Sequence, residues 1–521
     1  NFASMCNSFM LFCALNAVKG MFIKMIKLNK EIIRDKIYAC WIGKNIGGTF
    51  GGPYEATRDI LDIRDFATKK GEPLPNDDLD LQLVWLRAME EYGPYQMSPQ
   101  ILGEYWINFV GPYWNEYGVA KSNLRAGLAA PLCGEVNNEE WKHSNGAWIR
   151  SEIWACLAPG FPQIAMKYAY MDACVDHGGG EGTYAELFTA TMESLAFFET
   201  DITEIIQKSL QNITKASRLY QCIQMVVEGH KKGEDWKTIR NQLVEFCSDI
   251  GWFQAPANVA FVILGLLYGE GDFKQSMIYA VNCGDDTDCT AATVGAFLGI
   301  LYGTSGIPED WREYVGDRIV NAALTADCYD LPDSCRKLTE RVMLLMPVVF
   351  KANGVNMEWT NEKSDITYSR ELAGADGVSW DMYDRCQCSA TSLCSRNPYS
   401  FEAFSAVYAS GILEMDRAPI LKPGETIRLK LRMVNRMVDP RHMYFRLYLP
   451  EGWQADEYPK SAFMPYPNQK ELAAKGLPQP EFFWEAAVTA GERLERSNRV
   501  IIEVSAEGRS VVSLIPVTIL G

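Results

Sequence analysis

The sequence lacks an excess of basic residues, with 50 Lys and Arg against 66 Asp and Glu and a formal net charge of -16. Proteins bind a phosphate backbone through Lys and Arg. A nucleic-acid partner would therefore require a local basic patch on a protein whose overall electrostatic field is negative. We therefore predict no nucleic-acid partner. The chain also lacks an apolar run long enough to cross a bilayer, and we expect no membrane span.

The 15 cysteines lack the spacing of a disulfide framework, and many lie in apolar runs, as Cys40 does beside Trp41. This usage is typical of reduced thiols that fill a core, so we predict a cytoplasmic location. Cys386, Cys388 and Cys394 have no fourth ligand at zinc spacing and no nearby histidine, which argues against a zinc site.

Residues 1–24 are predicted to be a leader or an N-terminal extension. Residues 8–18 are apolar, but they are too few to span a bilayer, and the lysines Lys19, Lys24 and Lys27 follow them rather than precede them. An exported protein, with this stretch as its signal peptide, is the alternative to the cytoplasmic location.

The length of 521 residues predicts two or three domains. Within residues 25–354, apolar residues recur at spacings of three and four, as in Leu81, Val84 and Trp85, which predicts an all-α domain. Residues 291–302 are apolar and dense in Ala and Gly, so we expect a buried helix that packs closely against its neighbours.

The pattern changes after the helical region. Residues 355–400 are polar and are predicted to be a linker or the first strands of another domain. Within residues 401–521, strict alternation at 427–433 indicates a half-buried strand, and strands at 500–504 and 511–520 are predicted to form a hairpin. These short strands predict an immunoglobulin-like antiparallel β-sandwich, and the fold class is therefore multidomain, α and β.

A first acidic motif directly precedes a predicted helix and consists of Asn76, Asp77, Asp78, Leu79 and Asp80. One interpretation is structural: one residue caps the helix, and the others are solvated acids of its first turn, which the helix dipole favours. The other interpretation is a ligand cluster. The segment alone leaves both open.

A second acidic motif precedes the most apolar helix of the domain and consists of Gly284, Asp285, Asp286, Thr287 and Asp288. Several buried carboxylates need compensation, because an isolated buried charge costs several kcal/mol. The flanking residues offer no cation, which favours bound metal. Oxygen ligands indicate Mg²⁺ or Mn²⁺, and the glycine and the distal glutamate of an EF-hand are missing.

A glycine-rich segment covers residues 43–55 and ends at Glu55. It has no Gly-Lys-Ser/Thr ending and no preceding strand, so it is a poor phosphate loop. Its glycines allow either close helix packing or a close approach of the backbone to a ligand, in which case Gly52 would contact a substrate and Glu55 would act as an acid or base.

Four motifs occur in order, and as a set they resemble the ADP-ribosylglycohydrolase superfamily in its dinitrogenase-reductase-activating glycohydrolase-like form, over roughly residues 30–348. They are Tyr54-Glu55-Ala56, Asn76-Asp77-Asp78, Ser144-Asn145-Gly146-Ala147 and Gly284-Asp285-Asp286-Thr287-Asp288.

The resemblance implies an all-α domain that holds two Mg²⁺ or Mn²⁺ ions and hydrolyses a glycosidic bond at C1 of a ribose. Glu55, with Asp77 and Asp288, would lie at the catalytic centre. The metal ligands that it implies are Asn76, Asp77, Asp78, Asp286 and Asp288. Ser144, Asn145 and Gly146 would contact the substrate.

The loop that contains His177 and Gly180 is a further candidate for substrate contact. The alternative is a glycine-rich turn between two helices, in which His177 is an ordinary polar residue.

The sequence departs from the family pattern at four positions. Asn76 and Leu79 replace threonines, Gly48 replaces an aspartate, and Cys289 replaces a threonine that binds metal. A thiol is a softer and poorer ligand for Mg²⁺, and the adjacent Thr290 could substitute for it. These departures affect the substrate more than the fold.

We therefore expect a metal-dependent hydrolase that acts on a small-molecule or ADP-ribosylated substrate. One alternative is a glycosidase for a different sugar or a nucleoside-like compound, with the sandwich in contact with carbohydrate. Another is a catalytically silent binding or structural protein. The retained acids, Glu55 among them, argue against a silent protein, because without a role they would only destabilise the fold.

Overall fold

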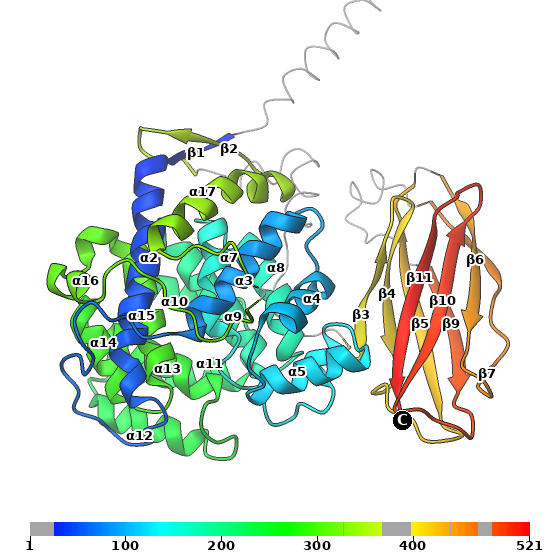
Figure 1. Ribbon diagram of the computed structural model, residues 1–521, viewed down its shortest axis with the longest axis horizontal. Coiled ribbons are helices and arrows are strands. Elements are labelled where there is room, and N and C mark those ends of the chain that lie inside the picture. The colour runs from blue at the N-terminus through cyan, green and yellow to red at the C-terminus, as the bar shows by residue number, and fades with distance from the viewer. Residues whose placement is uncertain (1–24, 327, 367–396, 438, 467–481) are drawn as a thin grey trace, which may run out of the picture.

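The structure is a computed structural model, and it describes residues 25–326, 328–366, 397–437, 439–466 and 482–521. Its N-terminal part is helical and its C-terminal part is made of strands (Figure 1). This arrangement confirms the predicted fold class. The predicted leader and the cysteines at positions 386, 388 and 394 lie outside the described residues.

The predicted all-α region is confirmed. The α-helices are α2 (Lys30–Gly51), α3 (Asp77–Tyr92), α4 (Pro99–Phe109), α5 (Asn115–Ala126), α6 (Leu132–Glu135), α7 (Glu152–Leu157), α8 (Pro162–Asp176), α9 (Glu181–Ala196), α10 (Ile202–Leu210), α11 (Arg218–Lys231), α12 (Trp236–Phe246), α13 (Ala255–Tyr268), α14 (Phe273–Asn282), α15 (Thr287–Tyr302), α16 (Glu309–Val315) and α17 (Cys335–Ala352). Three short 3₁₀ helices are η1 (Gly52–Tyr54), η2 (Trp148–Arg150) and η3 (Thr304–Gly306).

Helices α2 and α15 pack against each other along the centre of the helical domain (Figure 1). A Cβ atom at Gly43 would lie 2.0 Å from the backbone oxygen of Gly295, and one at Gly47 would lie 2.2 Å from that of Ala291. Only glycine allows so close an approach of two helix backbones. The predicted buried helix is confirmed as α15, and close packing explains these glycines of α2.

Strands β1 (Met25–Asn29) and β2 (Asn356–Thr360) form a two-stranded parallel sheet at the edge of the helical domain. Strand β2 falls in the segment predicted as a linker or as the first sandwich strands, 355–400. It joins neither sandwich sheet. The pairing of β2 with β1 was not predicted, because a short strand carries no sequence signal for a partner strand more than 300 residues away.

The C-terminal part contains two antiparallel sheets, with strand orders β11-β10-β6-β8 and β3-β4-β5-β9-β7. The strands are β3 (Ser400–Ser405), β4 (Ala409–Met415), β5 (Thr426–Asn435), β6 (Arg441–Tyr448), β7 (Gln454–Ala455), β8 (Ser461–Met464), β9 (Phe482–Thr489), β10 (Ser497–Ala506) and β11 (Val512–Leu520).

The two sheets share a core. Phe445 of β6 stacks on Trp484 of β9 with ring centroids 5.3 Å apart, although these strands belong to different sheets. The predicted strand at 427–433 is part of β5, and the predicted hairpin is β10 paired with β11. These observations agree with a β-sandwich.

The sandwich contacts the helical domain at the C-terminal end of α5 (Figure 1). Ser497 Oγ donates to the backbone oxygen of Ala126 at 2.6 Å, and Thr518 Oγ1 donates to that of Gly127 at 2.7 Å. Because α5 begins beside the acidic motifs, as described below, the sandwich supports a helix that reaches the candidate site.

The cysteines of the described residues are free thiols, and all of them except the half-buried Cys328 are buried. This confirms the prediction of core-filling thiols. None of the described helices is both long and apolar enough to span a bilayer.

Candidate metal and active site

The first acidic motif confirms the helix cap of its structural interpretation, but Asp78 and Asp80 are buried rather than solvated. Asn76 caps α3, because its Oδ1 accepts from the backbone N–H of Asp78 at 2.8 Å. This cap places Asp77 and Asp78 on the first turn of the helix. Asp80 lies on a different side of α3, where its carboxylate accepts hydrogen bonds from the backbone N–H groups of residues 322–323.

The second acidic motif forms a sharp turn at the start of α15. Asp285 lies in the left-handed region with φ 70°, and its carboxylate accepts from Asn258 Nδ2 at 2.8 Å and from the backbone N–H of Phe253 at 3.1 Å. These bonds fix the turn. Asp286 and Asp288 are thereby left free to face the first motif.

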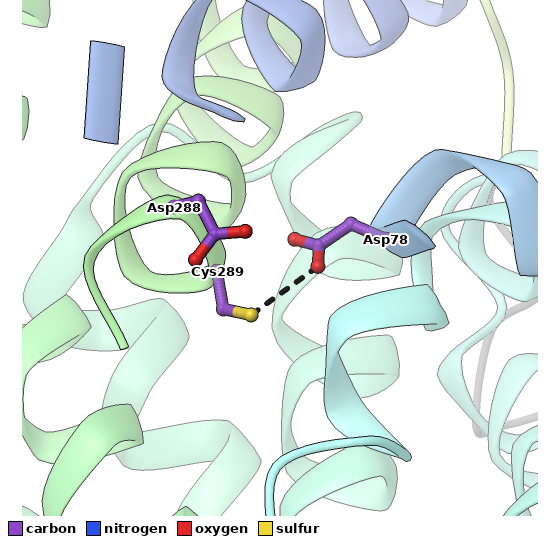
Figure 2. A group of neighbouring side chains, drawn as sticks. All are labelled: Asp78, Asp288 and Cys289. Atoms are coloured by element: carbon purple, nitrogen blue, oxygen red, sulfur yellow. Dashed lines mark hydrogen bonds between the residues drawn. The ribbon is translucent and has the colours of Figure 1, made fainter. Parts of the chain in front are cut away.

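The two motifs meet in one cluster. Asp78, Asp288 and Cys289 each supply a ligand atom, and these atoms lie within 4.8 Å of one another. The same holds for Glu55, Asp286 and Asp288. Figure 2 shows Asp78 on α3 directed toward Asp288 and Cys289 on α15. The sequence predicted this convergence of carboxylates from the two motifs.

The loop after η1 holds Glu55 at the cluster. Ala56 N–H donates to the backbone oxygen of Asp285 at 2.9 Å, and Asp285 N–H donates to that of Thr57 at 2.9 Å. Glu55 is open to solvent on one side. Desolvation by the surrounding protein, with repulsion from Asp288 and Asp77, raises the pKa of Glu55 to about 7.

The other carboxyls are also hard to ionise without a cation. Burial, with repulsion from Asp288, raises the pKa of Asp77 to about 6, although a hydrogen bond of 3.0 Å from the Tyr117 hydroxyl opposes this. Burial raises the pKa of Asp78 well above its usual range, and the pKa of Asp286 likewise. The metal-free cluster therefore holds protons near neutral pH.

Lys44, which lies in the glycine-rich segment, corrects the expectation that the buried carboxylates have no cationic side chain beside them. The sequences that flank the second motif offer no cation, but Lys44 Nζ lies 3.5 Å from Asp78 Oδ2 and 2.7 Å from Glu152 Oε1. Burial would lower the pKa of Lys44, yet Glu152 and Asp78 outweigh it and raise that pKa, so the ammonium stays charged. One lysine does not balance this many acids.

Three carboxylate oxygens of the cluster have no hydrogen-bond partner although they are shielded from solvent: Asp78 Oδ2, Asp286 Oδ1 and Asp288 Oδ1. A buried acceptor without a partner costs about 1–3 kcal/mol, and more when it is charged. Divalent cations bound among these carboxylates would supply the partners that the oxygens lack. The residues present therefore fit a metal site.

The predicted substrate-contact segment lies against this cluster. Asn145 Nδ2 donates to Asp286 Oδ2 at 2.6 Å, and Trp148 Nε1 donates to Asn145 Oδ1 at 3.1 Å. The backbone N–H of Gly146 donates to Glu116 Oε1 at 3.2 Å. Asn145 thus orients the Asp286 carboxylate, which leaves the other oxygen of that carboxylate for a ligand.

A model of the ADP-ribosylglycohydrolase family matches residues 29–342, which is more than half of the chain. The chain belongs to the ADP-ribosylglycohydrolase family. The match begins at the cap of α2 and contains both acidic motifs, so the cluster lies wholly within the family domain.

Similarity to individual relatives is more limited. An ADP-ribosylarginine hydrolase Tri1 of Pseudomonas putida (strain GB-1) is 40% identical over 52 residues, 10% of this chain and 14% of the relative. The ADP-ribosylhydrolase ARH3 of Gallus gallus is 20% identical over 232 residues, 38% of this chain and 62% of the relative. The chain thus covers less than two thirds of the length of each.

Among solved structures, one described as an ADP-ribosylglycohydrolase-related protein complex aligns with 62% of this chain and 99% of its own. The TM-score is 0.42 at 18% sequence identity.

Two departures from the family pattern lie against each other. A Cβ atom at Gly48 would lie 1.9 Å from Asn76 Nδ2. The Asn76 side chain therefore occupies the space that a side chain at position 48 would need.

Thr290 and Gly52 are two further residues that were predicted to belong to the site. Thr290 is buried, and its Oγ1 donates to the backbone oxygen of Thr287 at 3.2 Å. Gly52 is half-buried at the start of η1. As a metal ligand and a substrate contact, respectively, they stay predictions.

The structure does not bring His177 and Gly180 to the open side of the cluster. His177 is fully buried, with Nε2 3.1 Å from Ser144 Oγ and Nδ1 2.9 Å from Asp176 Oδ1. A Cβ atom at Gly180 would lie 1.9 Å from the backbone oxygen of Lys142. Both therefore pack behind the segment that carries Asn145, and their contact with substrate stays a prediction.

Proposed function

We propose that this protein is a divalent-metal-dependent hydrolase that cleaves a glycosidic bond to C1 of the ribose in an ADP-ribosyl compound. The observation that supports it is the set of carboxylates from Asp78, Asp286 and Asp288 at the starts of α3 and α15, each with a buried oxygen that has no hydrogen-bond partner. This cluster lies within the part of the chain that the family model matches.

We assign the metal ligands to the carboxylates of Asp77, Asp78, Asp286 and Asp288. These oxygens suit Mg²⁺ or Mn²⁺. The two ligand groups share Asp288, an arrangement that suits two neighbouring ions. When bound, such ions act as Lewis acids and orient the ribose hydroxyls beside the scissile bond.

Glu55 is assigned as the group that moves a proton. It stands on the solvent side of the cluster, where its carboxylate is open to water that approaches from solvent. We propose that Glu55 takes a proton from the water that attacks C1.

The fixed polar contacts position the reacting groups. Tyr117 donates to Asp77, and Asn145 donates to Asp286, so both carboxylates are held in one orientation. We propose that Gly52, which is half-buried, and the buried segment Ser144 to Gly146 contact the substrate.

Hydrolysis of an ADP-ribosylated arginine peptide tests this function, because the Tri1 relatives are named for ADP-ribosylarginine hydrolysis. Release of free ADP-ribose is measured by chromatography with Mg²⁺, with Mn²⁺ and with EDTA. We expect release that depends on metal and that is abolished in Asp286→Asn. Absence of release from arginine, serine and free ribosyl conjugates at every metal concentration would overturn the proposal.

A further inference from the structure

The thiol of Cys289 lies inside the candidate metal cluster. Cys289 follows Asp288 on the first turn of α15, and its Sγ lies 3.2 Å from Asp78 Oδ1 (Figure 2). Its side chain is buried, with 6% of the residue exposed. Sγ and one oxygen each of Asp78 and Asp288 lie within 4.8 Å of one another. Ligands at about 2.0–2.3 Å from one ion are separated by about 3–4.5 Å, so this triangle fits a single ion.

The surroundings of this thiol differ from those of other buried cysteines. Cys133 and Cys283 donate to backbone oxygens, those of Val175 at 2.9 Å and Tyr279 at 3.3 Å. Such contacts are typical of thiols that fill a core. Cys289 instead points at a carboxylate, which is an environment of negative charge rather than of apolar packing.

A second observation shows that this environment requires a cation. Asp78 is fully buried, and its Oδ2 has no hydrogen-bond partner. The nearest cation, Lys44 Nζ, lies 3.5 Å from that oxygen and is shared with Glu152, whose Oε1 is closer at 2.7 Å. The carboxylate beside the thiol is therefore left without full compensation.

We propose that Cys289 binds one of the two ions as a thiolate, together with Asp78 and Asp288, and that this position prefers Zn²⁺, Co²⁺ or Mn²⁺ over Mg²⁺. The inference rests on the metal site of the proposed function and specifies one half of it. On binding, the thiol proton leaves to solvent and the sulfur lone pair forms the bond to the ion. No oxidant or reductant is involved.

The preference follows from ligand chemistry. A thiolate is a soft ligand, Mg²⁺ is a hard ion, and affinity for such sites rises from Mn²⁺ to Co²⁺ and is high for Zn²⁺. The neighbouring position, at Asp286 and Asp288 beside Glu55, offers oxygen atoms only and suits Mg²⁺ or Mn²⁺. The two positions share Asp288 but differ in ligand type, so the pair of ions is unequal.

Absorption spectroscopy of the Co²⁺-loaded full chain tests the thiolate ligand without measuring activity. Chelator-treated protein is titrated with Co²⁺, and the near-ultraviolet charge-transfer band between thiolate and Co²⁺ is recorded for wild type, Cys289→Ser and Cys283→Ser. We expect the band in wild type and in Cys283→Ser, and its loss in Cys289→Ser. Calorimetry should show at least ~10-fold weaker Zn²⁺ binding in Cys289→Ser, with little change for Mg²⁺.

The possible outcomes separate the two proposals. If Co²⁺ binds to wild type without the band, the thiolate ligand is overturned while the metal-dependent hydrolase stands. If the band survives in Cys289→Ser, another cysteine produces it and the inference fails. If no divalent ion binds to wild type, both proposals fail. If Cys289→Ser does not fold, cadmium NMR of the wild-type protein still tests for a thiolate ligand, because the chemical shift of bound cadmium distinguishes sulfur from oxygen ligands.

Discussion

Glu55 is the residue on which the proposed chemistry depends most. In Glu55→Gln the side chain keeps its size but cannot take a proton, so we expect activity to fall by about 10²–10⁴-fold. The midpoint of thermal unfolding in EDTA at pH 8 should stay the same or rise, because a charge repelled by Asp288 and Asp77 is removed. Steady-state kinetics and calorimetry measure the two effects.

A matched control for this variant is Glu72→Gln, which changes an exposed glutamate of the same long loop. Its activity should equal that of wild type. Full activity in Glu55→Gln would contradict the assignment of Glu55 as the proton acceptor.

Lys44 is the residue that compensates the buried carboxylates of Asp78 and Glu152. We expect Lys44→Met to lower the free energy of unfolding by about 3–5 kcal/mol at neutral pH, because removing one partner leaves buried charge without compensation. Lys44→Met/Glu152→Gln should recover part of the loss. Chemical denaturation measures both variants, and an unchanged stability of Lys44→Met would show that the lysine is not needed.

At the scale of elements, the packing of α2 on α15 sets the distance between the two acidic motifs. Gly47→Ala would place a methyl group 2.2 Å from the backbone oxygen of Ala291. A backbone cannot move aside as a side chain can, so we expect a loss of about 1–3 kcal/mol or more in the free energy of unfolding. Metal affinity should fall as well.

The control is Gly103→Ala in α4, where the nearest atom is the flexible end of Leu124 at 3.0 Å. Its stability should change little, because the gain in helix propensity offsets a small adjustment. Equal stability losses in the two variants would argue against a special role for the contact between α2 and α15.

The elements that the sequence predicted are those with a local signal. Helix α15 is recognised from its apolar composition, dense in Ala and Gly, and the hairpin of β10 and β11 from two apolar strands joined by turn-like residues. The acids stand directly beside helix starts. The pairing of β1 with β2 and the ion pair of Lys44 with Glu152 were missed, because both join segments far apart in the sequence. Periodicity fixes which face of a segment is buried, but not which distant segment covers it.

Residues that support the site also escaped prediction for a physical reason. Tyr117 and Asn258 are ordinary helix residues in the sequence, and only the packing of α5 and α13 brings them to Asp77 and Asp285. The position of Cys289, by contrast, was evident as a departure from the family pattern. Its contact with Asp78 required the structure.

For the whole molecule, the raised carboxyl pKa values link stability to pH. The pKa rises from 4.5 to about 7 for Glu55 and from 3.8 to about 6 for Asp77. Between the ordinary and the raised values the folded chain binds more protons than the unfolded chain, so stability falls as pH rises from about 4 to about 7. Below and above that window these groups add no slope.

We therefore expect the midpoint of thermal unfolding in EDTA to fall from pH 5 to pH 8, and Mn²⁺ to restore it more at pH 8 than at pH 5. Glu55→Gln/Asp77→Asn, run as a comparison, should show a smaller fall. An equal fall in the variant and in wild type would mean that other groups cause the pH dependence.

The central claim is that the cluster binds divalent ions that in turn bind an ADP-ribosyl group. The most direct measurement is calorimetric titration of Mn²⁺ into the chelator-treated full chain, with and without ADP-ribose, beside Asp286→Ala/Asp288→Ala. We expect Mn²⁺ to bind to wild type but not to the variant, and ADP-ribose to bind more tightly when Mn²⁺ is present. Equal Mn²⁺ binding by both proteins, or ADP-ribose binding that ignores the metal, would contradict it.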